Sequence, residues 1–165
     1  AASDVYKRQI LGLSIVIGIL LCIGGIIFIE PLMRTFGASD TSLPLAKDYA
    51  FWMFVAALAN LPAQCMNCAA RAESSVKISS IAVITGALLN ILLDPVFMFD
   101  WGLGMGVEGA SLATTISQFV TFFLLMWFYL SGRSVIKLHI RSFRPSGKLI
   151  WTVTSIGIPL SLIHI

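Results

Sequence analysis

The chain has 165 residues, of which 58% are hydrophobic and only 12% are charged, and its formal net charge is +3. Soluble domains average about 45–50% apolar and about 25% charged residues, so this composition excludes an ordinary soluble domain. We therefore predict an all-α polytopic membrane protein. Four stretches are long enough to cross a bilayer as helices, at residues 10–29, 49–70, 78–99 and 109–130.

The two ends of the chain differ in character from the rest. Residues 1–9 (AASDVYKRQ) and 161–165 (SLIHI) resemble translated library-adaptor sequence, and we exclude both from fold reasoning. Residues 10–148 are then expected to form one helical bundle fragment, with 149–160 as the start of a further helix. The chain is predicted to be an internal piece of a larger membrane protein.

The first predicted span, 10–29, is rich in Ile, Leu and Gly and ends at Glu30-Pro31. The segment PLMRTFGAS that follows predicts a short interfacial helix with a glycine stop. The second predicted span, 49–70, opens with aromatic residues typical of a membrane interface.

Polar residues interrupt the second predicted span. Asn60, Gln64 and Asn67 make it more polar than a lipid-facing helix tolerates, and Pro62 predicts a bend. We expect this helix to line a cavity or to pack within a bundle, with the three amides as cavity-lining candidates.

Cys65 and Cys68 lie in the same apolar segment with C-x-x-C spacing. No strand pattern lies nearby, and a redox or metal role would need more thiolates or histidines. The interpretation is that both are small buried core residues.

The third predicted span holds the only charged side chain within the four spans, Asp94. A carboxylate at that depth costs roughly 2.5–3.5 kcal/mol on insertion scales, so it needs a partner or a function. Asn90 projects from the same helical face one turn earlier. Pro95 cannot donate to the carbonyl of Ile91, which predicts a kink and a freed oxygen beside the carboxylate.

The fourth predicted span carries small residues every four positions, which favours close helix packing. They form one stripe of Gly109, Ala113, Ser117 and Thr121, and an adjacent stripe of Ala110, Thr114 and Gln118. The preceding glycines match G-x-G-x-x-G, but no acidic residue follows Glu108, as a dinucleotide site would require. They predict a tight turn between two membrane helices.

Basic residues are distributed unevenly between the spans. The positive-inside rule places the 71–77 and 131–148 connections in the cytoplasm, and 30–48 and 100–108 outside. A nucleic-acid-binding patch is the rival interpretation of the basic 133–148 run, and we predict no nucleic-acid partner.

Several segments together resemble one transporter family. ITGALLNILLDPVFMF followed by GLGMGVEGASLATTISQ closely resembles the fifth and sixth helices of the multidrug and toxic compound extrusion (MATE) family. NLPAQCMNCAARAESSVK is similar to its fourth helix and following turn, and PLMRTFGAS with DYAFWMF to its third-to-fourth connection. GKLIWTVTSIGIPL is similar to the beginning of the seventh helix.

The resemblance implies two six-helix bundles, of which this chain holds helices three to six of the amino-terminal bundle plus the start of seven. It also implies an ion site shared by an aspartate on the first helix, an asparagine and an aspartate on the fifth, and a threonine on the sixth. These last three correspond to Asn90, Asp94 and Thr114, with Thr115 as a register alternative. The first-helix aspartate would lie upstream, and Arg71 is followed by Ala-Glu-Ser-Ser where the family often has glycine.

The expected function is a cation-coupled antiporter that exports drugs or other organic cations in exchange for Na⁺ or H⁺. Na⁺ would be held by oxygens at Asn90 and Asp94, because hard cations take oxygen ligands. We predict no other metal, no cofactor and no enzymatic activity. The expected setting is a prokaryotic cytoplasmic (inner) membrane. The expected partners are the bilayer, small cationic organic substrates, and the remainder of the same polypeptide.

Three alternatives stay open at this point. Asn90 and Asp94 can form a static hydrogen-bond lock between helices. The protein can be a lipid-linked precursor flippase of the same superfamily, although such proteins line their cleft with arginines and no base lies within these spans. It can also be a membrane scaffold that transports nothing.

Overall fold

The computed structural model describes residues 2–131, and they form five helices. The predicted 131–148 connection beyond its first residue, the 149–160 helix start and the 161–165 tail lie outside the described residues. The helices are α1 (Ala2–Ile27), α2 (Ile29–Thr35), α3 (Leu43–Ala72), α4 (Val76–Met98) and α5 (Val107–Leu130).

Four of these helices are long and apolar enough to cross a membrane, which confirms the predicted number of spans. The second helix extends beyond the predicted span, because α3 begins at Leu43, six residues before Tyr49. Pro44 occupies its first turn, where a missing N–H costs nothing, and charged side chains follow at Lys47 and Asp48. Hydropathy therefore locates the apolar part of this helix and misses its polar first turns.

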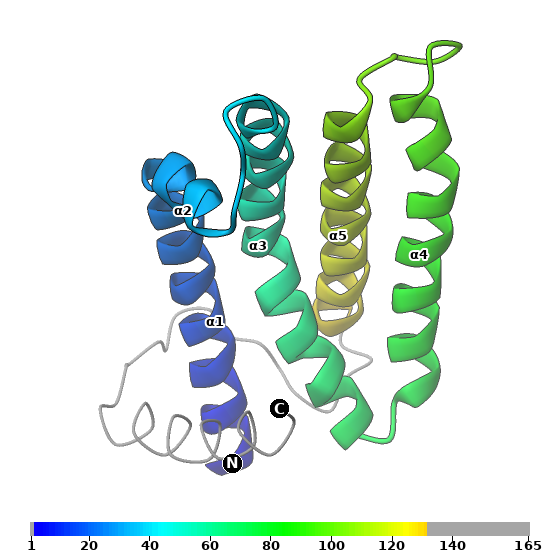
Figure 1. Ribbon diagram of the computed structural model, residues 1–165. Coiled ribbons are helices and arrows are strands. Elements are labelled where there is room, and N and C mark those ends of the chain that lie inside the picture. Colours follow the sequence, from blue (N-terminus) through cyan, green and yellow to red (C-terminus); the bar gives the residue numbers. More distant parts are fainter. Residues whose placement is uncertain (1, 132–165) are drawn as a thin grey trace.

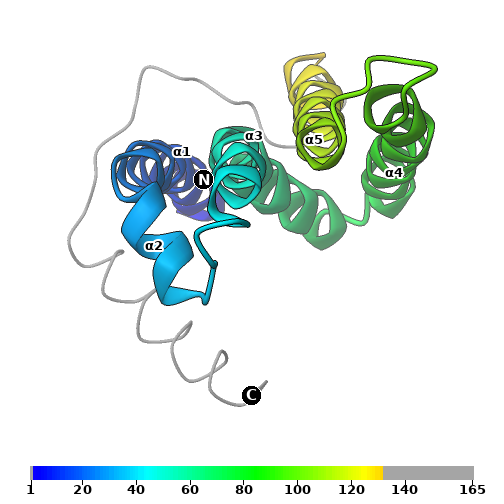
Figure 2. The same ribbon diagram turned by 45° about the horizontal axis from the view of Figure 1, so that its top comes forward.

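The membrane helices run alternately up and down and do not pack in chain order (Figure 1). Helix α3 packs against α1 and α5, and α5 packs against both α3 and α4. The view turned by 45° shows the resulting row α1–α3–α5–α4, with the short α2 lying beside α1 and α3 (Figure 2). The row places α5, which carries Thr114, between the two other helices that carry predicted site residues.

The connections also alternate between the two ends of the row. The α2 region and the α4–α5 connection lie at one end, and the α3–α4 turn lies at the other (Figure 1). This is the arrangement that the charge pattern requires. The assignment of each end to a compartment stays a prediction.

The buried core lies toward the end of the row that holds the α3–α4 turn. Its members come from α3, α4 and α5, and they are Ala63, Met66, Ala70, Ala82, Leu125, Phe128 and Tyr129. The Tyr129 hydroxyl donates to the carbonyl oxygen of Met66 at 2.9 Å, so this buried phenol is satisfied. Large apolar side chains such as Leu20 and Leu92 are about two-thirds exposed on the outside of the row, as expected of surfaces that face lipid or further helices.

Glycines build the connection between α4 and α5. Gly104 and Gly106 have φ of +63° and +60°, a region that side chains disfavour. The Leu103 and Met105 amides donate back to the carbonyls of Val96 and Phe97, each at 2.9 Å. The interpretation of the G-x-G-x-x-G match as a tight turn between membrane helices is confirmed.

Charged side chains join α2 to the beginning of α3. Lys47 lies 3.2 Å from Glu30, and Arg34 lies 2.9 Å from Asp40. The hydrogen bond and charge of Lys47, followed by those of Arg34, hold the pKa of Glu30 below its ordinary value. Gly37, with φ of +91°, follows α2 and supplies the predicted glycine stop.

Candidate functional site

The amide of Asn90 lies between the two other predicted ion-site residues. Its Nδ2 donates to Asp94 Oδ1 and to Thr114 Oγ1, both at 3.2 Å. The three side chains are only partly buried in the described chain. One helix supplies the asparagine and aspartate because residues four apart share a face, and α5 supplies the hydroxyl from across the α4–α5 contact.

The rotation of α5 separates the two threonines that the sequence left as alternatives. Thr114 Oγ1 accepts from Asn90 and donates to the Ala110 carbonyl at 2.9 Å. Thr115 is buried on the other side, and its hydroxyl proton is shared between the Ser111 carbonyl at 2.7 Å and the carbonyl of Trp52 on α3 at 2.9 Å. The structure thus brings Thr114, and not Thr115, to Asn90.

The two prolines lie inside continuous helices. Pro62 is buried within α3, whose axis changes direction along its length in Figure 1. Pro95 lies in the last turn of α4, which ends at Met98. A bend at Pro95 would therefore move little more than this last turn and the connection after it.

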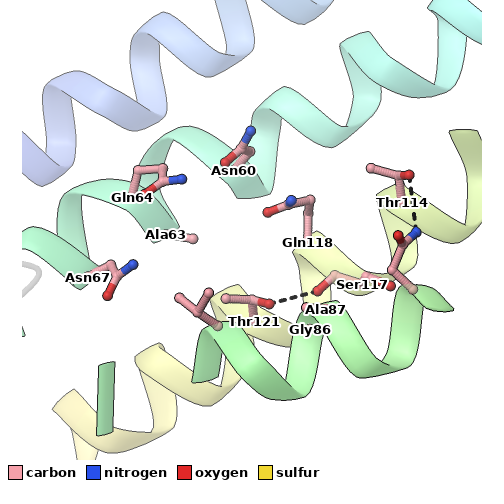
Figure 3. A pocket seen from close by; sticks show the side chains of 12 residues that line it. Asn60, Ala63, Gln64, Asn67, Gly86, Ala87, Thr114, Ser117, Gln118 and Thr121 are labelled. Atoms are coloured by element: carbon pink, nitrogen blue, oxygen red, sulfur yellow. Dashed lines mark hydrogen bonds between the residues drawn. The ribbon is translucent and has the colours of Figure 1, made fainter. Parts of the chain in front are cut away.

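A cavity of about 280 Å³ opens between α3, α4 and α5 beside the Asn90 cluster. No charged side chain is among its lining residues in the described chain. They are Asn60, Ala63, Gln64, Asn67, Val83, Gly86, Ala87, Asn90, Thr114, Ser117, Gln118 and Thr121. All three amides of α3 named from the sequence lie on this wall, and Gln118 extends toward them from α5 (Figure 3).

The amides on the α3 wall differ in their hydrogen bonding. Asn67 is buried and accepts a hydrogen bond from Ser79 on α4. The buried Oδ1 of Asn60 accepts none from the described residues. Asn67 thus contributes to packing as well as to the wall, whereas Asn60 presents an unused acceptor, which is costly to bury without a partner.

A close approach of α4 to α5 brings Asn90 within reach of Thr114. A side chain at Gly86 would collide with Thr121 Oγ1 and lie 3.3 Å from the Ser117 carbonyl. In the first turn of α5, next to the α4–α5 connection, Gly109 lies directly against the carbonyl of Phe97. The predicted small-residue stripe on α5 is buried in these contacts, which confirms its packing role.

Sequence reasoning missed two features of this region. Gln118 was recognised only as part of a stripe, although it lies one turn after Thr114 and so shares its face. Trp52 Nε1 donates to Glu108 Oε1 at 3.0 Å, a contact 56 residues apart that no local pattern indicates. Together with the Thr115 bond, this contact holds α5 against α3.

The interpretation of both C-x-x-C residues as buried was wrong. Cys68 is exposed, and Cys65 is only partly buried. The apolar composition of the segment suggested burial, but this side of α3 is not fully covered by the described helices.

Comparison with known proteins identifies the family of this chain. The MatE family model matches residues 2–96. The chain belongs to the MatE family. Among curated relatives, the multidrug export protein MepA of Staphylococcus aureus (strain bovine RF122 / ET3-1) is 27% identical over 152 residues, which cover 92% of this chain and 33% of MepA. The FAD transporter of Shewanella oneidensis is 32% identical over 122 residues, covering 72% of this chain and 26% of that protein.

Solved MATE structures agree with the fold of this chain. An outward-facing multidrug resistance MATE transporter superposes with a TM-score of 0.86 at 30% identity, covering 96% of this chain and 35% of that one. An inward-facing MATE transporter superposes with a TM-score of 0.79 at 30% identity, covering 90% of this chain and 34% of that one. The chain therefore forms part of the amino-terminal bundle of a MATE-type fold, and it spans about a third of the length of the relatives it matches.

Proposed function

We propose that the full-length MATE polypeptide carrying this segment exports small organic molecules in exchange for entering Na⁺ or H⁺. The observation that carries the proposal is the Asn90–Asp94–Thr114 cluster, with its two 3.2 Å contacts inside membrane helices. An ionisable side chain within a membrane span is costly, and such residues typically mark ion pathways. The export function is suggested by the multidrug export protein among the relatives.

The cluster supplies chemistry for either coupling ion. Asp94 can take up a proton, which removes a charge from the membrane interior. For Na⁺, the Asn90 amide would turn about its terminal bond and present oxygen in place of nitrogen. The ion would then meet oxygens from Asn90, Asp94 and Thr114, the ligand type that hard cations prefer. Binding of either ion would favour one of two conformations of the transporter.

The cavity supports a neutral or cationic cargo. Its described lining offers amides and hydroxyls but no basic side chain, and the unused Asn60 oxygen can accept a hydrogen bond from a cargo N–H. A strongly anionic cargo would have no cation to pair with on this wall. The FAD transporter among the relatives makes such a cargo worth testing directly.

The experiment compares two aspartate variants of the full-length protein in a drug-sensitive bacterial host. Asp94→Asn removes the titratable group but keeps its shape, and Asp100→Asn changes an exposed aspartate beyond the end of α4. We expect ethidium efflux to fall to background in Asp94→Asn and to persist in Asp100→Asn. If Asp94→Asn still shows cation-driven ethidium efflux, the proposed role of this cluster in ion coupling is wrong.

Transport assays in reconstituted vesicles distinguish between the two coupling ions and between the candidate cargoes. Ethidium export driven by a Na⁺ gradient at equal pH identifies Na⁺, and export driven by a pH gradient without Na⁺ identifies H⁺. Transport of FAD or a lipid-linked precursor, but of no organic cation, by the wild-type protein would contradict the proposed cargo. The ion site would then still be tested by comparing Asp94→Asn with Asp100→Asn for that cargo.

A further inference from the structure

Two thiols and a guanidinium lie together near the end of α3. Cys65 and Cys68 are three residues apart, so they share one side of the helix, and both are free thiols. Arg71 follows one turn later, and its Nη2 donates to Cys68 Sγ at 3.4 Å. Within the described chain Cys68 is exposed and Cys65 is partly buried.

The helical spacing favours a bridged pair of thiols over a disulfide. Side chains three apart on a helix have their Cβ atoms about 5–6 Å apart. A disulfide needs Cβ atoms about 3.5–4.5 Å apart, so closing one here would distort the helix. A metal–thiolate bond of about 2.3 Å, as for zinc, implies that an ion between two sulfurs spans about 4.6 Å. That span is close to the separation of residues three apart on a helix.

The number of ligands selects the class of ion. Within the described chain, no group of three or more His, Cys, Asp or Glu side chains could hold a metal. Structural zinc takes four protein ligands, so zinc would need the further thiolates or histidines that the sequence lacks here, and this pair does not suit it. Thiolates select soft ions, among which copper(I) is stable with two sulfur ligands.

We propose that Cys65 and Cys68 form a two-sulfur site for a copper(I)-class ion. Binding replaces two S–H bonds by two metal–sulfur bonds and releases two protons, with no change of oxidation state. The product, one monovalent cation with two thiolates, carries a charge of −1. The guanidinium of Arg71, already in contact with Cys68, offsets this charge.

The place of the pair in the fold fits this chemistry. It lies in the last turns of α3, next to the 71–77 connection that the positive-inside rule assigns to the cytoplasm. The cytoplasm keeps thiols reduced, as the site requires. The proposal does not depend on the transport activity, because the pair lies on α3 outside the Asn90 cluster and outside the described cavity lining.

The experiment is an anaerobic competition for copper(I) between the purified full-length protein and the chromophoric chelator bicinchoninate. We expect the wild type to withdraw one more equivalent of copper(I) than Cys65→Ser or Cys68→Ser. Cys22→Ser, which changes the buried thiol of α1, should match the wild type. Arg71→Gln should weaken binding several-fold, and Arg71→Lys should restore it.

A second measurement needs no variant. Copper(I) should protect Cys65 and Cys68 of the wild type from alkylation by N-ethylmaleimide, as read by peptide mass spectrometry, while leaving other accessible cysteines reactive. Equal alkylation with and without copper(I), or equal copper(I) uptake by the Cys65→Ser and wild-type proteins, would overturn the proposal.

Discussion

The contact between α4 and α5 makes Gly86→Ala a sharp perturbation of the candidate site. The new methyl group would collide with Thr121 Oγ1 and lie 3.3 Å from the Ser117 carbonyl. Thr121 can avoid the collision by rotating, but it then loses its 2.9 Å bond to the Ser117 carbonyl. Asn90 lies one turn after Gly86 on the same face, so a forced separation of the helices would also lengthen its bond to Thr114.

The change in stability on Gly86→Ala combines one stabilising contribution and two destabilising ones. Alanine is favoured over glycine within a helix by about 1 kcal/mol. Loss of the Thr121 hydrogen bond costs about 1 kcal/mol, and an overpacked contact costs about 1–3 kcal/mol. Gly24→Ala is the matched control, because it also lies within a membrane helix and its methyl group meets nothing within 4 Å. The helix term cancels between the two variants, so Gly86→Ala should be less stable than Gly24→Ala by about 2–4 kcal/mol.

The assay is the thermal unfolding midpoint of the full-length protein in detergent, with ethidium efflux measured in parallel. We expect Gly86→Ala to melt below the wild type and Gly24→Ala at or above it. Thr121→Ala in the Gly86→Ala background removes the colliding oxygen and should recover most of the loss. Equal midpoints for the two glycine variants, or no recovery in the double variant, would refute the close α4–α5 packing described above.

Three further perturbations test other contacts. Thr114→Val should raise the coupling-ion concentration for half-maximal transport about tenfold, equivalent to ~1.4 kcal/mol for one lost oxygen ligand, while Thr114→Ser should stay near the wild type. The same half-maximal concentration in Thr114→Val and the wild type would exclude Thr114 from the site. Tyr129→Phe should lower stability by about 0.5–1.5 kcal/mol through loss of its interhelical hydrogen bond, and an unchanged unfolding midpoint would contradict that bond. Lys47 and Arg34 lower the pKa of Glu30, so their stabilisation is complete above its ordinary value of 4.5 and is lost as the pH falls through the lower folded value. Unfolding midpoints across that acidic range should therefore depend on pH more weakly in Glu30→Gln than in the wild type.

Physical rules of the bilayer explain why so much of the fold could be predicted. Lipid offers no hydrogen-bond partners, so an apolar stretch of sufficient length must be helical. The stretch 78–99 thus predicts α4 to within two residues at its start and one at its end. The start of α3 was missed because its first turns are polar, and polarity conceals a helix from hydropathy without preventing it.

Local periodicity predicted the Asn90–Asp94 pair and left its partner on α5 open. Residues four apart on a helix must share a face, so the pairing of Asn90 with Asp94 follows from their spacing alone. The choice between Thr114 and Thr115 does not, because adjacent residues point about 100° apart and either could face α4. The contacts of Trp52 with Thr115 and Glu108 decide the rotation of α5.

The sequence by itself therefore determined the membrane class, the number of spans, the Asn90–Asp94 pair and the amide-rich face of α3. Each of these depends on composition or on spacing within one helix. The tertiary structure alone decided that α5 lies between α3 and α4, that Thr114 rather than its alternative Thr115 contacts Asn90, and that Cys68 is exposed. These depend on which helix faces meet, and that is set by long-range packing such as Gly86 against Thr121, which no local pattern encodes.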